Sequence, residues 1–122
     1  MNLKNSKIMV VDDSDCFREM ITDTFEHAGC EVISAENGEI ALSHLNNYSP
    51  DVIVTDIDMP VMNGICLLKK VRAQNPDMKM LILTGYPKKE NQKVANSYEV
   101  EILEKPVSRK ILLKKIDNLL HS

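Results

Sequence analysis

The most constraining feature of this sequence is an alternation of short apolar runs with longer segments of helical periodicity. Five runs rich in β-branched and apolar residues predict strands, at Lys7–Val11, Glu31–Ala35, Val52–Thr55, Lys79–Thr84 and Glu99–Leu103. Between and after them, apolar residues recur every three or four positions, as on one face of a helix. This alternation favours parallel strands, because parallel neighbours need a crossover connection. We therefore expect an α/β protein with a doubly wound five-stranded parallel sheet and five helices.

Capping and breaking residues delimit the first three expected helices. Ser14 and Asp15 supply N-cap chemistry for the first helix, which is expected to end at Gly29. Turns are expected at Asn37-Gly38, before a short second helix, and at Asn63-Gly64, before the third. These breaks leave short connections, as expected for one compact unit.

The last two helices are expected to differ in how firmly they are anchored. The segment 88–93 contains no apolar residue, so the fourth helix is expected to be short and mobile. Ser108 caps the fifth helix, whose apolar face is predicted to comprise Ile111, Leu112, Ile116, Leu119 and Leu120.

Length and charge limit the class of function. With 122 residues the chain is expected to form one domain over 1–122. A net charge of −3 argues against a nucleic-acid ligand, which needs a basic face. No apolar run approaches the ~20 residues of a membrane span, and the N-terminus lacks a signal-peptide core. Cys16, Cys30 and Cys66 are far apart and form no CxxC pair, so they are interpreted as packing or incidental thiols rather than as a disulfide framework or a zinc site. A cytoplasmic location is the resulting expectation.

Polar side chains follow four of the five predicted strands. Asp12 and Asp13 follow the first strand, Asp56 the third, Thr84 ends the fourth, and Lys105 follows the fifth. Ligands of open α/β sheets bind outside the carboxyl ends of the strands. Taken singly, each residue has an ordinary interpretation as a helix cap, a turn hydroxyl or a solvated charge. Together they predict one site at that edge.

The residue types in this predicted site favour phosphoryl chemistry. Converging carboxylates repel one another, and a hard divalent cation such as Mg²⁺ relieves that repulsion. Lys105 supplies a compact positive charge, and Thr84 a hydroxyl donor, for phosphoryl oxygens. Asp56 beside a metal is equipped to attack phosphorus and form an aspartyl phosphate. No His or Cys is placed for acyl chemistry.

Four stretches together resemble the response-regulator receiver domains of two-component signalling, in the single-domain CheY-like form. They are Val-Val-Asp12-Asp13-Ser, Asp56-Ile-Asp-Met-Pro-Val-Met-Asn-Gly64, Leu-Thr84-Gly and Glu-Lys105-Pro106. The resemblance covers essentially the whole chain and implies a flavodoxin-like fold with strand order 2-1-3-4-5.

The resemblance also implies a role for each site residue. Asp56 would accept phosphate from a histidine kinase, and Thr84 and Lys105 would contact the phosphoryl group. Asp12, Asp13 and Asp56 would bind Mg²⁺, with the backbone carbonyl of Asp58 completing the site. The Lys105-Pro106 bond would be cis.

Partners follow from the same resemblance. They would be a sensor histidine kinase or phosphotransfer protein and an unidentified downstream protein, without direct nucleic-acid binding or membrane insertion. The protein would not be an enzyme beyond catalysing its own phosphorylation and dephosphorylation.

One position departs from the family pattern. Many receivers carry Phe or Tyr three residues before the lysine, where this chain has Ile102. That ring cannot report phosphorylation here, so we expect the signal to pass through the loop 84–86 and the weak fourth helix. Tyr98 is an alternative ring, with a core or anchoring role favoured over a switching one.

Two other functions remain open at the level of the sequence. Asp56-Ile-Asp58 after an apolar strand resembles the nucleophile motif of haloacid-dehalogenase-like phosphatases. That family needs a longer chain and places its metal-binding acid pair late, whereas the pair comes first here. A receiver that binds partners without phosphate is the second alternative, suggested by Ile102 and the altered fourth helix.

Overall fold

The sheet has five parallel strands in the order β2-β1-β3-β4-β5, which confirms the predicted architecture. The computed structural model describes residues 2–121. Its strands are β1 (Lys7–Val11), β2 (Glu31–Ala35), β3 (Val52–Thr55), β4 (Lys79–Thr84) and β5 (Glu101–Glu104). The strand order reverses between β1 and β3, because β2 lies on one side of β1 and β3 on the other.

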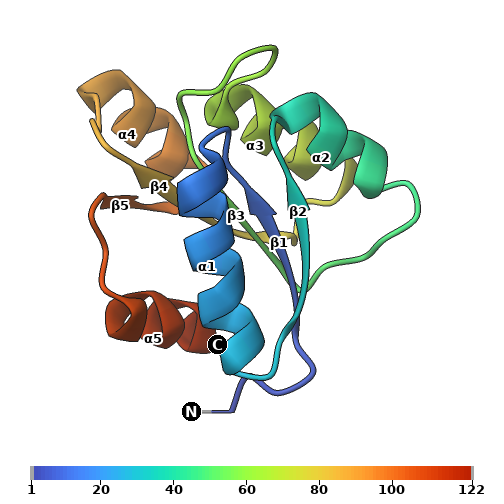
Figure 1. Ribbon diagram of the computed structural model, residues 1–122. Helices are drawn as coiled ribbons and strands as arrows, with labels where there is room; N and C mark the ends of the chain where they lie inside the picture. Colours follow the sequence, from blue (N-terminus) through green and yellow to red (C-terminus); the bar gives the residue numbers. More distant parts are fainter. Residues whose placement is uncertain (1, 122) are drawn as a thin grey trace.

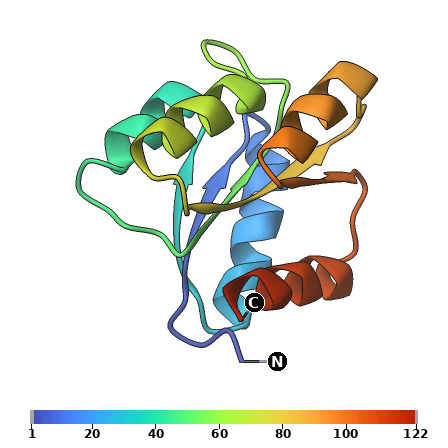
Figure 2. The same cartoon turned by 180° about the vertical axis from the view of Figure 1, so that it is seen from behind.

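Helices cover both faces of the sheet (Figures 1 and 2). The helices are α1 (Asp15–His27), α2 (Gly38–His44), α3 (Gly64–Gln74), α4 (Lys89–Ser97) and α5 (Arg109–Leu120). The face of α1 and α5 and the face of α2, α3 and α4 each enclose a separate apolar cluster. Among residues 2–121, no helix is long and apolar enough to cross a membrane.

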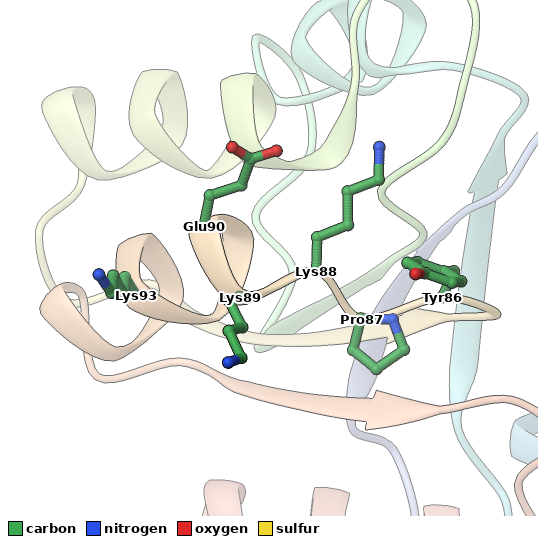
Figure 3. Close-up of a pocket in the computed structure, with 6 residues that line it drawn as sticks. All are labelled: Tyr86, Pro87, Lys88, Lys89, Glu90 and Lys93. Carbon is green, nitrogen blue, oxygen red and sulfur yellow. The ribbon is translucent and has the colours of Figure 1, made fainter.

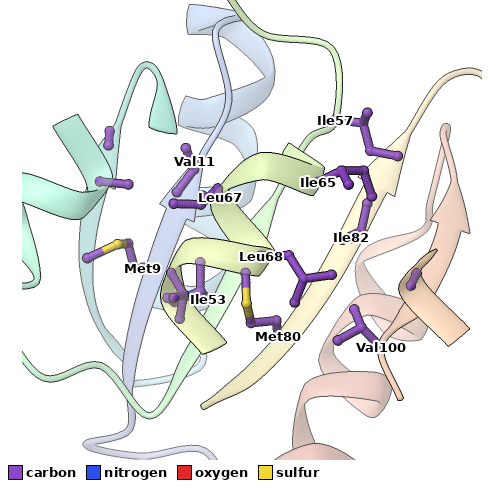
Figure 4. Close-up of a cluster of buried hydrophobic side chains, with 14 residues drawn as sticks. Met9, Val11, Ile53, Ile57, Ile65, Leu67, Leu68, Met80, Ile82 and Val100 are labelled. Carbon is purple, nitrogen blue, oxygen red and sulfur yellow. The ribbon is translucent and has the colours of Figure 1, made fainter. Parts of the chain in front are cut away.

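The two apolar clusters divide the central strands residue by residue. On β3, Val52 and Val54 face the cluster that contains Phe25 of α1. Ile53 faces the opposite cluster with Leu67 of α3 (Figure 4). All four β3 residues are buried, as expected for a strand covered on both faces. This packing fixes where β3 ends in the sheet, and it therefore fixes the position of Asp56, the residue that follows the strand.

Asparagine caps replace two of the turns expected from the sequence. The side chains of Asn37 and Asn63 accept hydrogen bonds from the N–H groups of Ile40 (2.9 Å) and Cys66 (2.8 Å). The glycine after each asparagine is the first residue of α2 or α3, rather than part of a turn. The Asn-Gly dipeptide alone does not distinguish a turn from a helix cap, because asparagine serves both purposes.

Two predicted details near the C-terminal end are wrong. β5 begins at Glu101 rather than Glu99, which has a left-handed φ of 59°. Val100 N–H still bonds Ala95 O at 2.9 Å, so the exit from α4 uses these residues. Ile111 is half exposed, because the buried stripe of α5 runs through Leu112 and Ile116 instead.

α4 is anchored mainly at its C-terminal end. Ala95 is its one buried residue, and Lys88 at its N-cap makes no side-chain capping bond. Arg72 of α3 donates from Nη1 to the carbonyl of Tyr98 (2.9 Å) and from Nε to that of Met78 (2.7 Å). Tyr98 also packs against the cluster on this face, consistent with an anchoring role. The helix is short, as predicted, and its N-terminal end follows the strand end of β4.

Candidate functional site

Three carboxylates meet at the carboxyl edge of the sheet. Asp12 follows β1 and Asp56 follows β3, and the N–H of Asp56 donates to Val11 O at 3.0 Å. One carboxylate oxygen from each of Asp12, Asp13 and Asp56 lies within 4.8 Å of the others. Asp12 and Asp56 are buried whereas Asp13 is exposed. An all-oxygen set that is open to water on one side suits a hard cation such as Mg²⁺, and it is typical of the Mg²⁺ site of receivers.

Lys105 neutralises part of this negative charge. Its Nζ lies 2.9 Å from Oδ2 of Asp12 and 3.4 Å from Oδ2 of Asp56. The backbone N–H of Lys105 donates to Thr84 O at 2.8 Å, which ties the ends of β4 and β5 together. The Lys105-Pro106 peptide bond is cis, as the family resemblance implies. Lys105 follows β5, an edge strand of the sheet, and its side chain reaches the acidic cluster from there.

Burial dominates the electrostatics of Asp56. Desolvation raises the pKa of its carboxyl above the ordinary 3.8, and the positive charge of Lys105 opposes that rise. The negative charge of Asp12 reinforces it, whereas a hydrogen bond from Ile57 N–H to Oδ1 (2.7 Å) favours the ionised form. The net direction is upward, so ionised Asp56 is a cost to the folded state unless a cation joins it.

This raised pKa predicts how stability depends on pH. The folded state binds the Asp56 proton more tightly, so its contribution to stability is present below pH 3.8 and is lost as the pH rises through the raised pKa. Asp56→Asn removes that cost, and we expect a gain of about 1 kcal/mol at neutral pH without divalent cations. Urea unfolding of both proteins at acid and neutral pH measures it.

Mg²⁺ provides the counterpart of the same experiment. A cation that binds the folded site stabilises wild type in proportion to the logarithm of its concentration. The difference in free energy of unfolding between Asp56→Asn and wild type should therefore shrink as Mg²⁺ is added. A chelator that removes Mg²⁺ should restore the difference. If Asp56→Asn is no more stable than wild type in the presence of a chelator, the raised pKa of Asp56 does not destabilise the folded state.

Thr84 and Asp58 lie at or just beyond strand ends, on the same edge of the sheet as the cluster. Thr84 is fully buried at the end of β4, and its Oγ1 accepts a 3.4 Å hydrogen bond from Tyr86 N–H. Asp58 is exposed in the loop after β3, two residues beyond Asp56. The predicted phosphoryl contact of Thr84 and the predicted metal contact of the Asp58 carbonyl therefore stay predictions.

The loop that carries Asp58 is closed by a tight backbone contact. Gly64 N–H donates to Ile57 O at 2.9 Å. A Cβ on Gly64 would lie 2.0 Å from the carbonyl oxygen of Asp56. The glycine thus lets α3 begin directly against the backbone of the buried aspartate.

Two contacts at the site were not foreseen from the sequence. Arg18 of α1 donates from Nη1 to the backbone carbonyl of Asp12 at 2.6 Å. The Nζ of Lys105 lies over the Phe17 ring, 4.0 Å from its centroid. Their position at the start of α1, just after the end of β1, is the only signal in the sequence that could have indicated either contact. The apolar periodicity of the helix instead predicted a core position for Phe17.

A hollow lies beside the start of α4. It is lined by Tyr86, Pro87, Lys88, Lys89, Glu90 and Lys93 (Figure 3). The side chains of Lys88 and Lys89 extend in opposite directions in this view. The ammonium groups of Lys88 and Lys89 therefore do not converge on one point in this hollow.

Comparison with known proteins defines the class. Residues 8–117 match the family model described as "Response regulator receiver domain". Chemotaxis protein CheY4 of Vibrio cholerae has a similar structure, with a TM-score of 0.89 and 34% identity over 95% of this chain and 99% of that one. A CheY-like receiver domain protein from Methanospirillum hungatei gives a TM-score of 0.92 at 29% identity, over 97% and 95% of the two chains. The chain therefore belongs to the response regulator receiver domains of two-component signalling.

Longer curated proteins are also similar to it. A cyclic di-GMP phosphodiesterase of Thermotoga maritima is 32% identical over 94% of this chain but 31% of its own length. A protein-glutamate methylesterase/protein-glutamine glutaminase of Halalkalibacterium halodurans is 36% identical over 93% of this chain and 34% of its own. The chain thus spans about a third of these relatives. Receiver domains are typically non-catalytic beyond the chemistry of their own phosphorylation, and membership implies a kinase partner in general.

Proposed function

We propose that this protein is a phosphoacceptor receiver that takes a phosphoryl group from a histidine kinase or phosphotransfer protein onto Asp56. One observation carries the proposal: the buried Asp56 carboxylate shares a cluster with Asp12 and Asp13 and lies 3.4 Å from the Lys105 ammonium. A nucleophile, a cation site and a positive charge for phosphoryl oxygens are therefore adjacent. Residues 1–122 would act as one receiver unit, which the family match over 8–117 supports.

In the proposed transfer, a carboxylate oxygen of Asp56 attacks the phosphorus of a phosphohistidine. The new O–P bond forms as the N–P bond breaks, and the imidazole leaves. Lys105 and Thr84 would donate hydrogen bonds to the phosphoryl oxygens. The Ile57 N–H, bonded to Oδ1 at 2.7 Å, holds the carboxylate in a fixed orientation.

The acidic cluster would hold the cofactor. Asp12, Asp13 and Asp56 fit Mg²⁺ by donor type, and the backbone carbonyl of Asp58 would complete the set. When bound, Mg²⁺ supplies positive charge that stabilises the transferring phosphoryl group. Asp13, the exposed member, would be the ligand nearest to solvent.

The protein would switch a partner-binding surface rather than turn over a substrate. It would catalyse only its own phosphorylation and dephosphorylation, and the phosphoryl group would change the affinity for an unidentified downstream protein. Direct nucleic-acid binding and membrane insertion are not part of the proposal. A small Mg²⁺-dependent aspartyl-phosphate phosphatase and a phosphorylation-independent interaction module are the alternatives. Incubation with acetyl phosphate separates all three.

The readout of phosphorylation would use the loop after β4 and the N-terminal end of α4. Ile102 is half-buried in β5 and offers no ring to reorient. The Tyr86 N–H bond to Thr84 Oγ1 is long at 3.4 Å, so little opposes rotation of that hydroxyl toward a phosphoryl group. Arg72 holds the C-terminal end of α4, which leaves the N-terminal end free to move.

This readout predicts a defined pattern of NMR shifts. Beryllofluoride, a phosphoryl mimic, should shift the backbone amides of residues 84–93 strongly and those next to the Arg72 anchor weakly. The backbone amide of Ile102 should shift only slightly, as expected for a residue that neighbours the changing segment without taking part in the change. Unshifted amides throughout 84–98, with the mimic bound, would rule out this route.

A further inference from the structure

We propose that the ring of Phe17 positions the Lys105 ammonium for its contact with the phosphoryl group, an inference that rests on the proposed function. The Nζ of Lys105 lies 4.0 Å from the centroid of the Phe17 ring. A cation over an aromatic face at this distance is attracted by the negative face of the ring. Phe17 is thus a positioning residue, because it acts through Lys105.

The ring is fixed by the same segment that carries the acidic pair. Phe17 lies in the first turn of α1, and its N–H donates to Oγ of the N-cap Ser14 at 3.3 Å. Its half-buried side chain packs against the apolar cluster on the α1 and α5 face. Arg18, the next residue, bonds the carbonyl of Asp12 at 2.6 Å. The position of the ring is therefore coupled to the backbone of Asp12.

The other two partners of Lys105 change their bonding during the proposed reaction. Asp12 would hold the cation, and Asp56 would become the acyl phosphate, so neither oxygen stays available to the ammonium. The ring can do neither, because it has no lone pair for a metal and no nucleophile for phosphorus. Of these three partners, the ring alone keeps the same contact before and after transfer.

A long, flexible side chain needs such a partner. Lys105 reaches the site on four methylene groups, and its side chain is 20% exposed. Water is thus partly excluded from the contact, which strengthens the attraction to the ring relative to a surface pair. Without the ring, no contact would hold the ammonium throughout the transfer, and the side chain could extend into solvent. The result would be slower phosphoryl transfer with an intact fold.

The alternative role for Phe17 is core packing, and matched variants separate the two roles. Phe17→Leu keeps apolar bulk but removes the aromatic face, whereas Phe17→Tyr keeps the face. Met20 also lies on α1 and packs against the same cluster, so Met20→Ala reports a loss of packing without a change at Lys105. We expect acetyl phosphate to label Phe17→Leu about fivefold more slowly than wild type, within the range for a partly buried cation–π contact. Phe17→Tyr and Met20→Ala should stay near the wild-type rate.

A second measurement needs neither metal nor phosphate. Protons held over an aromatic face are shifted upfield, so the Lys105 side-chain protons next to Nζ should be upfield of those of Lys110 in NMR spectra. Phe17→Leu should abolish that shift, and Phe17→Tyr should retain it. Wild-type Lys105 signals at ordinary positions would overturn the proposal.

The two measurements also distinguish the proposal from the function on which it rests. If wild type takes up no phosphoryl group, the proposed function fails, and the NMR experiment still shows whether the ring holds the ammonium. If the upfield shift is present but Phe17→Leu is labelled at the wild-type rate, the positioning role is overturned while the receiver function stands. Equal slowing in Phe17→Leu, Phe17→Tyr and Met20→Ala would assign Phe17 to packing alone.

Discussion

Acetyl phosphate with Mg²⁺ is expected to add one phosphoryl group to the wild-type protein and none to Asp56→Asn. An amide has almost the size of a carboxylate and can still accept the Ile57 N–H bond seen at Oδ1, but it is not a nucleophile toward phosphorus. In wild type the Asp56 oxygen–phosphorus bond forms and acetate leaves. The loss should be complete, because the proposed function assigns the other two acids of the cluster, Asp12 and Asp13, to the cation. Intact-mass spectrometry measures the adduct directly.

A matched control makes the labelling result specific. Asp77→Asn removes an exposed carboxylate in the connection after α3, remote from the strand ends that form the site, and should be labelled like wild type. Label on Asp56→Asn would show that another residue is the acceptor. Continuous turnover of acetyl phosphate without a lasting adduct would favour the phosphatase alternative. No adduct on wild type would favour an interaction module that works without phosphate.

Gly64→Ala is expected to cost about 3 kcal/mol or more of folding free energy. The new Cβ would lie 2.0 Å from the carbonyl oxygen of Asp56 and 3.0 Å from Cα of Ile57. Both are backbone atoms held by β3, so no flexible side chain can move aside. Relief would require α3 to shift away from the strand end, and this would also displace the Asp56 carboxylate. Phosphoryl uptake should therefore fall together with stability.

Gly85 is the matched control for this substitution. A Cβ at Gly85 would meet nothing within 4 Å, so Gly85→Ala should change the free energy of unfolding by less than about 0.5 kcal/mol. Urea unfolding of the two variants and wild type measures the difference. Equal, small effects at both glycines would show that the start of α3 adapts and that the close approach at Asp56 is not required.

The site residues could be predicted because their placement follows from topology. Asp12, Asp56 and Lys105 directly follow strands, Asp13 comes next after Asp12, and parallel strands end at one edge of the sheet. No knowledge of side-chain packing was needed to bring the carboxylates together, since strand order and handed crossovers already place these residues. The family resemblance then added their roles.

Details that depend on packing were predicted less well. Ile111 fits a helical stripe by spacing, but α5 turns Leu112 and Ile116 toward the sheet and leaves Ile111 half exposed. Asn63-Gly64 has the composition of a turn, yet Asn63 caps α3 and Gly64 begins it. In both cases the local pattern allows two structures, and contacts with distant segments select one.

The sequence by itself determined the strand–helix alternation, the polar residue at the end of each site-forming strand and the helix caps at Ser14 and Ser108, because these features follow from local periodicity and local hydrogen bonds. Only the tertiary structure decided the contact of Lys105 with the Phe17 ring, the approach of Gly64 to Asp56 and the direction of the Asp56 pKa shift. Each of these depends on the distance between segments that are far apart in the chain or meet at a tight turn. Such distances are set by how the core packs, and core packing is a property of the whole fold.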